Sequence, residues 1–213
     1  MAEISAVLAH SIFDESDALA EELTSYISLA LFDDSQRIKT SHIACSLSLE
    51  YWASIRVLLR SGLLPSAAVV HRAQFEAVTR SIWLLYAASD NQIKKFSATL
   101  SLDSEQSTKN APQVAEMMQI LASNAPPQAY DALLRFKKNS WNALNSYVHA
   151  GIHPIRRHEG GYPVHLLHDV LRNANGLAVF SCMQAAVLSG LQPLQREILT
   201  LAAKHPNCMP PVL

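Results

Sequence analysis

Apolar side chains recur at every third or fourth position along almost the whole chain, and no segment shows the sustained alternation of a strand. Glycine is scarce, and most prolines stand where a helix would begin or end. The pattern predicts helices over Ala2–Ile12, Asp17–Phe32, Ser35–Ser61, Pro65–Ala88, Asn91–Leu102, Pro112–Ala122, Pro126–His149, Val164–Ser189 and Pro193–Lys204. We therefore expect an all-α protein.

These segments predict one helical bundle over residues 1–213, with three or four long central helices and shorter flanking helices. N-terminal helices occupy residues 1–33, and an irregular proline-rich tail covers residues 205–213. Asp14 or Ser16 is expected to cap the second helix and Asp90 a shorter one, while Gly62 ends the third. Gly151 and Pro154 are expected to end the seventh helix and to begin a loop that runs to residue 163.

Composition narrows the class of protein. The 213 residues are 49% hydrophobic and 16% charged with a net charge of -1, which excludes a disordered chain and a strongly basic nucleic-acid module. Three widely spaced cysteines favour a reducing compartment with no disulfide partner. The first residues hold no Lys or Arg, so no signal peptide is predicted, and no apolar run is long enough to cross a membrane. We expect a cytoplasmic protein.

The helix that begins at Pro65 is apolar on nearly all sides, which is typical of the central helix of a bundle. Arg72, Glu76 and Arg80 nevertheless stand four residues apart and form one charged row on it. Such a row is explained structurally by an Arg–Glu–Arg ladder of ion pairs that fixes the register of the helix. It is explained functionally by the floor of a cleft, with Glu76 as a base or Arg72 as an anion clamp.

Five of the nine histidines lie within one short segment: His149, His153, His158, His165 and His168. On the preceding helix Asn142, Asn145 and His149 share a row with Lys138. His165, His168, Asp169 and Arg172 form a second polar row, and Arg156, Arg157 and His158 lie between the two rows. Acidic residues instead crowd the first fifty positions, so a local basic surface is compatible with a neutral chain. The two rows either face each other across a cleft or are ordinary solvated faces.

Three chemistries compete for this segment. His149 and His153 with His165 and His168 have the helical spacing that aligns imidazoles on a divalent metal, although no HExxH pattern is present. Alternatively, His149 acts as a general acid/base. In the third case, a phosphate or an RNA backbone is held without catalysis by Arg156, Arg157, His158 and Arg172.

Two segments, His71-Arg-Ala-Gln-Phe-Glu76 and Leu144-Asn-Ser-Tyr-Val-His-Ala-Gly151, resemble the HEPN superfamily, and are most similar to its bacterial branches of unknown function. The resemblance implies an all-α bundle, a homodimer formed through the apolar helices, and, in many members, a metal-independent ribonuclease of toxin or antiphage systems. The superfamily's hallmark is an Arg, a polar residue and then a His. Asn145 and His149 match the last two, but Leu144 replaces the arginine.

The resemblance and the residues together predict RNA binding or metal-independent RNA cleavage, with no cofactor. His149 would be the acid/base, with Asn142 and Asn145 positioning it and Arg72 and Glu76 completing the site. The residues expected to contact the substrate are Arg156, Arg157, His158, His165, His168 and Arg172. The alternatives are a non-catalytic interaction domain and a histidine-bound metal.

Overall fold

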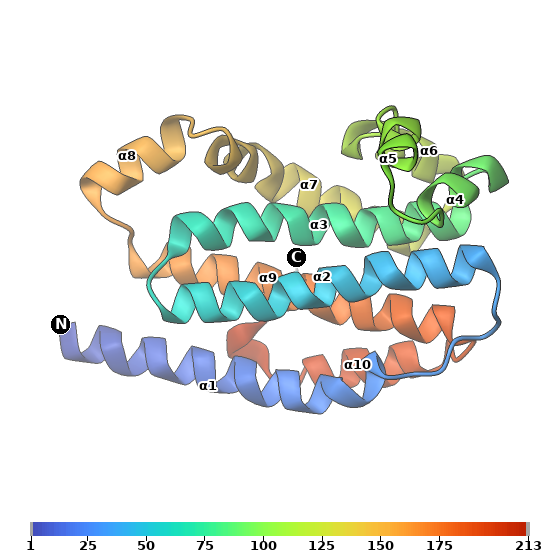
Figure 1. Ribbon diagram of the computed structural model, residues 1–213. Coiled ribbons are helices and arrows are strands. Elements are labelled where there is room, and N and C mark those ends of the chain that lie inside the picture. Colours follow the sequence, from blue (N-terminus) through green and yellow to red (C-terminus); the bar gives the residue numbers. More distant parts are fainter. Residues whose placement is uncertain (1, 212–213) are drawn as a thin grey trace.

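The computed structural model describes residues 2–211, with side chains from Ile12 onward, and shows ten α-helices and no strand over these residues (Figure 1). The all-α prediction is confirmed. The long helices are α1 (Ala2–Ile27), α2 (Gln36–Arg60), α3 (Leu64–Tyr86), α7 (Pro127–Val148) and α9 (Val164–Leu188). The shorter ones are α4 (Asp90–Phe96), α5 (Leu102–Thr108), α6 (Val114–Asn124), α8 (Ile152–Gly160) and α10 (Leu194–Ala202), followed by a 3-10 turn, Pro206–Cys208.

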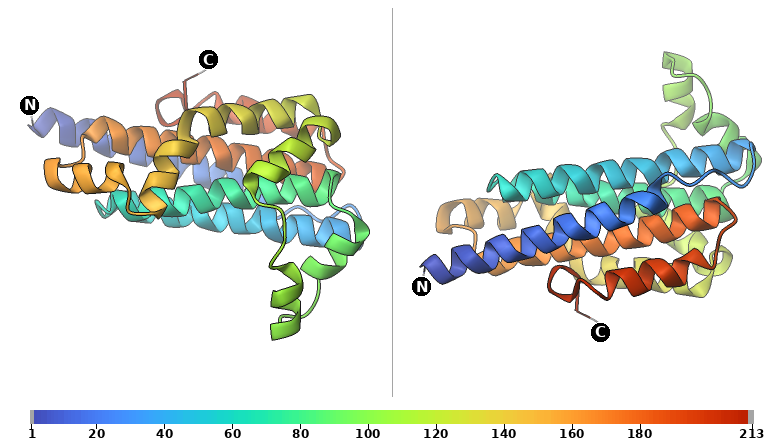
Figure 2. Two further views of the ribbon diagram at one scale, coloured as in Figure 1. Left: turned by 90° about the horizontal axis from the view of Figure 1, so that it is seen from above. Right: turned by 90° about the horizontal axis from the view of Figure 1, so that it is seen from below.

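Helix α3 is the centre of the bundle, because it packs against α2, α6, α7 and α9. One apolar cluster joins α1, α2, α9 and α10, and includes Leu19, Trp52 and Leu171. A second cluster joins α3 to α4, α6 and α7, and includes Phe75 and Phe136. The α4–α5 segment projects from the bundle in both views of Figure 2, and none of the residues of α5 is buried. The core therefore lies between the five long helices and the shorter helices α4, α6 and α10.

A seam of small polar side chains runs between α2, α3 and α9. The Ser41 hydroxyl donates to the Ser81 carbonyl over 2.8 Å, and Ser48 Oγ lies 3.0 Å from Ser181 Oγ. The Gln74 side-chain amide donates to the Ala174 carbonyl over 3.0 Å. Short side chains let the helix axes approach closely, and the hydrogen bonds satisfy polar groups that would otherwise destabilise the core.

Several predicted helix ends and breaks are wrong. Residues 2–27 form one continuous helix rather than two, because Ser16 is not a cap: it is buried and donates to the Asn175 side-chain oxygen over 3.0 Å. Asp90 is the first residue of α4, and Ser89 caps that helix. The helix predicted over residues 91–102 ends at residue 96, and the serine cap of α5, Ser101, begins another.

The expected loop after Gly151 is largely helical. Residues 152–160 form α8, because Gly151 is its N-terminal cap and Pro154 falls in its first turn, where a proline has no helical hydrogen bond to lose. The tail predicted as irregular over residues 205–213 holds the turn Pro206–Cys208, and residues 212–213 lie outside the described part. Gly62, with a φ of 74°, follows the end of α2 as predicted.

Candidate functional site

The second half of α7 carries the predicted polar row on its solvent side. Lys138, Asn142 and His149 are exposed and Asn145 is half-buried, so the four residues share one face as their spacing predicts. Leu144, which stands where the HEPN hallmark has an arginine, is only 5% exposed and belongs to the second apolar cluster. The position that would hold the hallmark cation therefore points into the core.

A rigid corner joins α7 to α8. His149 is the C-terminal cap of α7, and the Gly151 N–H donates to the Ser146 carbonyl over 2.7 Å. The Ser146 hydroxyl accepts from the His153 N–H over 3.2 Å, and a Cβ added at Gly151 would lie 2.6 Å from that hydroxyl. A side chain at Gly151 would therefore displace the Ser146 hydroxyl from this hydrogen bond. The exposed His149 and His153 lie on either side of the corner.

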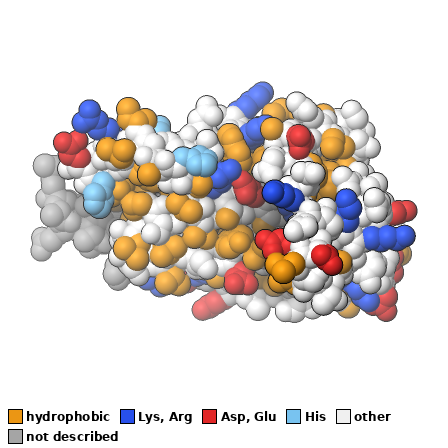
Figure 3. All heavy atoms as spheres, turned by 45° about the horizontal axis from the view of Figure 1, so that its top comes forward, with side chains coloured by type: hydrophobic (Ala, Val, Ile, Leu, Met, Phe, Trp, Pro, Cys, Tyr) orange, Lys and Arg blue, Asp and Glu red, His pale blue; other side chains and the backbone are white. Residues whose placement is uncertain are grey.

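Helix α8 is the most solvent-exposed part of this end of the molecule. None of its residues is buried, and Ile152 and Ile155 are 69% and 60% exposed. Arg157 and His158 are exposed, while Arg156 pairs with Glu159 over 3.0 Å. Figure 3 shows histidine and basic side chains gathered with apolar ones at this end. The predicted substrate-binding residues of α8, Arg156, Arg157 and His158, are therefore all accessible to solvent.

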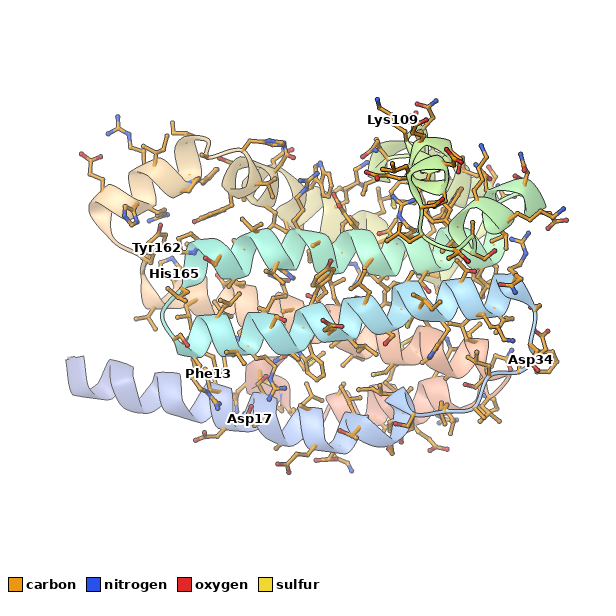
Figure 4. The ribbon with its side chains drawn as sticks, viewed as in Figure 1. Phe13, Asp17, Asp34, Lys109, Tyr162 and His165 are labelled. Carbon is orange, nitrogen blue, oxygen red and sulfur yellow. The ribbon has the colours of Figure 1, made fainter. Side chains whose placement is uncertain are left out.

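Two tyrosines, which the sequence did not single out, lie between α7, α8 and α9. Burial raises the pKa of Tyr147, as does the neighbouring Tyr162 hydroxyl, while the Arg157 guanidinium opposes this rise. Tyr162 and His165 lie close together in the connection between α8 and α9 and in the first turn of α9 (Figure 4). The buried Tyr162 Oη has no hydrogen-bond partner. The signal that could have identified them is aromatic residues interleaved with basic ones.

The second predicted polar row lies on α9, and one of its residues, Arg172, has a structural role. Arg172 Nε donates to the Asn207 carbonyl over 2.9 Å, and its guanidinium pairs with Asp169 over 3.5 Å, so Arg172 holds the C-terminal segment against α9. His165 is exposed and His168 is half-buried. Burial lowers the pKa of His168, and Arg172 and His165 add to this effect against the opposing charge of Asp169.

Arg72 and Glu76 form a separate group on α3. Their ion pair spans 2.9 Å, and the Arg72 guanidinium lies 4.8 Å from the centre of the Trp141 ring. In the described part of the chain no hydrogen bond or ion pair joins either residue to Asn142, Asn145 or His149. The α7 and α8 candidates thus lie on two helices that meet at the Gly151 corner, and no hydrogen bond or ion pair among the described residues connects the α3 pair to them.

Arg80, the third member of the expected Arg–Glu–Arg ladder, makes different contacts. Arg80 donates to the Pro112 carbonyl over 3.3 Å and its guanidinium lies over the Phe96 ring, and no salt bridge to Glu76 forms. The ladder is therefore confirmed for Arg72 and Glu76, and is wrong for Arg80.

Metal binding by the histidines finds no support. Among the residues with described side chains, no three His, Cys, Asp or Glu groups lie close enough to hold a metal ion. Within residues 2–211 no helix has the length and apolar character needed to cross a membrane. All three cysteines are buried free thiols.

Comparison with known proteins identifies a family for most of the chain. No curated protein and no solved structure matches the chain. Residues 45–211 match a family described as "Family of unknown function (DUF6988)", which leaves α1 and the first residues of α2 outside the match. Because this range spans well over half of the 213 residues, the chain belongs to the DUF6988 family.

Proposed function

We propose that the surface formed by the second half of α7 and by α8 binds the sugar-phosphate backbone of RNA. The observation that carries the proposal is the charge of residues 132–158: they hold five Lys or Arg residues and three His residues, and no Asp or Glu. The next residue, Glu159 of α8, is acidic and pairs with Arg156. All of the Lys, Arg and His side chains of residues 132–158 except Lys137 are exposed. Lys and Arg contacts to phosphates supply most of the affinity of proteins for single-stranded nucleic acid.

Binding is supported better than cleavage. A ribonuclease site of the HEPN type would need a cation beside His149, yet Leu144 faces the core and Arg72 is held by Glu76 and Trp141. Arg157 is exposed and its charge acts on Tyr147, two residues before His149, which makes it the cation that we assign to a phosphate. The resemblance to the HEPN superfamily supports RNA as the ligand.

The experiment is a titration of fluorescein-labelled single-stranded RNA, followed by fluorescence anisotropy at several salt concentrations. Wild type is compared with the double variant Arg156→Ala/Arg157→Ala. The matched control is Lys94→Ala/Lys95→Ala, which removes two exposed charges from α4. Loss of two phosphate contacts should weaken binding about tenfold or more and lower the slope of log K against log salt by about 1.4. The control should bind like wild type.

The same RNA, incubated with protein in EDTA and run on a denaturing gel, tests for cleavage. Cutting by wild type that His149→Ala abolishes would add a catalytic role for His149, with Asn142 and Asn145 beside it. If wild type does not bind RNA, the proposal is wrong and the non-catalytic interaction domain replaces it; that reading is favoured by the exposed Ile152 and Ile155. The predicted homodimer stays a prediction, which light scattering coupled to size-exclusion chromatography measures directly.

A further inference from the structure

Unsatisfied buried polar atoms gather on one helix. Among the described side chains, eight buried nitrogen or oxygen atoms have no hydrogen-bond partner, and five of them belong to α3. Three lie within a single turn and a half: Thr79 Oγ1, Arg80 Nη1 and Trp83 Nε1. Buried polar groups in proteins are nearly always paired, so a cluster of unpaired ones indicates a missing partner.

Phe96 of α4 joins two of these residues into one unit. The Arg80 guanidinium lies 5.3 Å from the centre of the Phe96 ring, and the Trp83 ring packs edge-on against it with the centroids 6.0 Å apart. Thr79 stands one helical turn before Trp83 and therefore shares its face of α3. Trp83 and Thr79 are fully buried, so their unpaired atoms lie inside the protein.

Arg80 forms no ion pair with any described carboxylate. Among the described side chains its one hydrogen bond is to the neutral Pro112 carbonyl, while Glu76 on the preceding turn pairs with Arg72. Burial lowers the pKa of Arg80, and the charge of Glu76 only partly opposes this. Figure 3 shows a hollow over the middle of α3, beside the α4–α6 segment, with basic and acidic side chains around it. Arg80 is half-buried, so part of its side chain reaches this face, while Thr79 and Trp83 lie beneath it.

We infer that the unit of Thr79, Arg80, Trp83 and Phe96 is a binding site for a small organic carboxylate. The guanidinium and indole nitrogens can only donate, so their partner must be an acceptor, and an anion satisfies the unpaired charge as well. A carboxylate fits better than a phosphate because Arg72, Glu76 and Arg80 together carry a single net positive charge. Apolar neighbours in the second cluster, among them Ile93 and Met117, suit an aromatic or aliphatic tail.

The test uses the indole N–H signals of the three tryptophans in a nitrogen–proton NMR spectrum during titration with sodium benzoate and, separately, sodium hexanoate. Trp83 should shift saturably with at least one of the two acids. Trp52 should not shift, because its indole already donates to the Asn175 side chain over 2.7 Å. Benzamide, a neutral analogue of benzoate, should have no effect on the Trp83 signal. Failure of both acids, or linear shifts of all three indoles, would overturn the inference.

Variants test the two donors. Arg80→Met keeps an apolar stem on Phe96 and should weaken binding at least about tenfold, since a charge-assisted hydrogen bond is lost. Lys95→Met removes an exposed charge from α4 and should leave affinity unchanged. If Arg80→Met does not fold, Arg80→Lys replaces it. Arg80→Lys should also weaken binding, because the planar guanidinium with its paired N–H donors is lost. Equal affinity in an Arg80 variant and wild type would contradict the inference. The RNA titration is independent of this result.

Discussion

The fold makes a strong prediction about His71, a fully buried histidine in the middle of the bundle. Gln74 fixes its tautomer: the Gln74 amide nitrogen donates to the Ala174 carbonyl over 3.0 Å, so its oxygen must accept from His71 Nδ1, which lies 2.9 Å away. His71 Nε2 is then unprotonated, and it has no partner and lies in an apolar region where the ring edge meets Phe136. Protonation would place an unpaired N–H and a charge in the core.

Burial accordingly lowers the pKa of His71 from 6.5 to about 4, although the hydrogen bond to Gln74 opposes the shift. Between these two pH values the unfolded chain binds the proton and the folded chain does not. The free energy of unfolding should therefore fall as the pH falls through this window. At about 1.4 kcal/mol per pKa unit, the loss is about 3 kcal/mol when the window has been crossed completely.

Urea unfolding followed by circular dichroism, repeated from about pH 7.5 to about pH 4.5, measures this loss. His71→Gln cannot titrate, so its free energy of unfolding should fall with pH less than that of wild type by most of the expected amount. His165→Gln removes an exposed histidine and should retain the full wild-type slope. Identical slopes for wild type and His71→Gln would refute a neutral His71 with an unpaired Nε2 in the core.

Three further predictions concern stability and reactivity. Gly190→Ala should destabilise the fold by about 1–2 kcal/mol in thermal unfolding, because φ is 71° and the new Cβ would lie 2.5 Å from the Phe32 side chain. The control Gly160→Ala should leave the stability unchanged, because the new Cβ would lie in open space. Asn175→Ala should cost about 2–4 kcal/mol in urea unfolding, because Asn175 bonds Ser16, Trp52 and the Cys208 carbonyl; a loss below 1 kcal/mol, on the order of one surface contact, would contradict this. Burial raises the pKa of every thiol, so a disulfide reagent should label none in the native protein and all after unfolding: Cys45, Cys182 and Cys208.

The bundle could be predicted from the sequence because the spacing of apolar residues predicts the helices, and Gly and Pro residues mark many of their ends. The apolar pattern of α3 was sufficient to predict a central helix, and the glycine after α2 was sufficient to predict where α2 ends. The break predicted near Ser16 failed because a polar residue in a helix can bond to a distant one, here Asn175, instead of capping. The seam of serines between α2, α3 and α9 could not be predicted either. A hydrophobic pattern does not distinguish a buried serine from an exposed one.

The candidate site could be predicted in part. Helical spacing was enough to place Lys138, Asn142 and His149 on one exposed face. It could not show that Arg172 would be used to hold Asn207, or that Tyr162 would lie beside Tyr147, because these contacts join segments that are distant in sequence or separated by a turn. The unpaired atoms of α3 were beyond prediction for a related reason: whether a donor finds a partner depends on all neighbouring helices at once.

The central claim is that the α7–α8 surface contacts RNA, and ultraviolet crosslinking of single-stranded RNA followed by mass spectrometry of the peptides tests it most directly. We expect crosslinked nucleotides to map to peptides from the second half of α7, which holds Trp141 and Tyr147, from α8, and from the connection to α9, which holds Tyr162. Adducts confined to peptides of α1, α2 or α10, or no adduct at all, would contradict it.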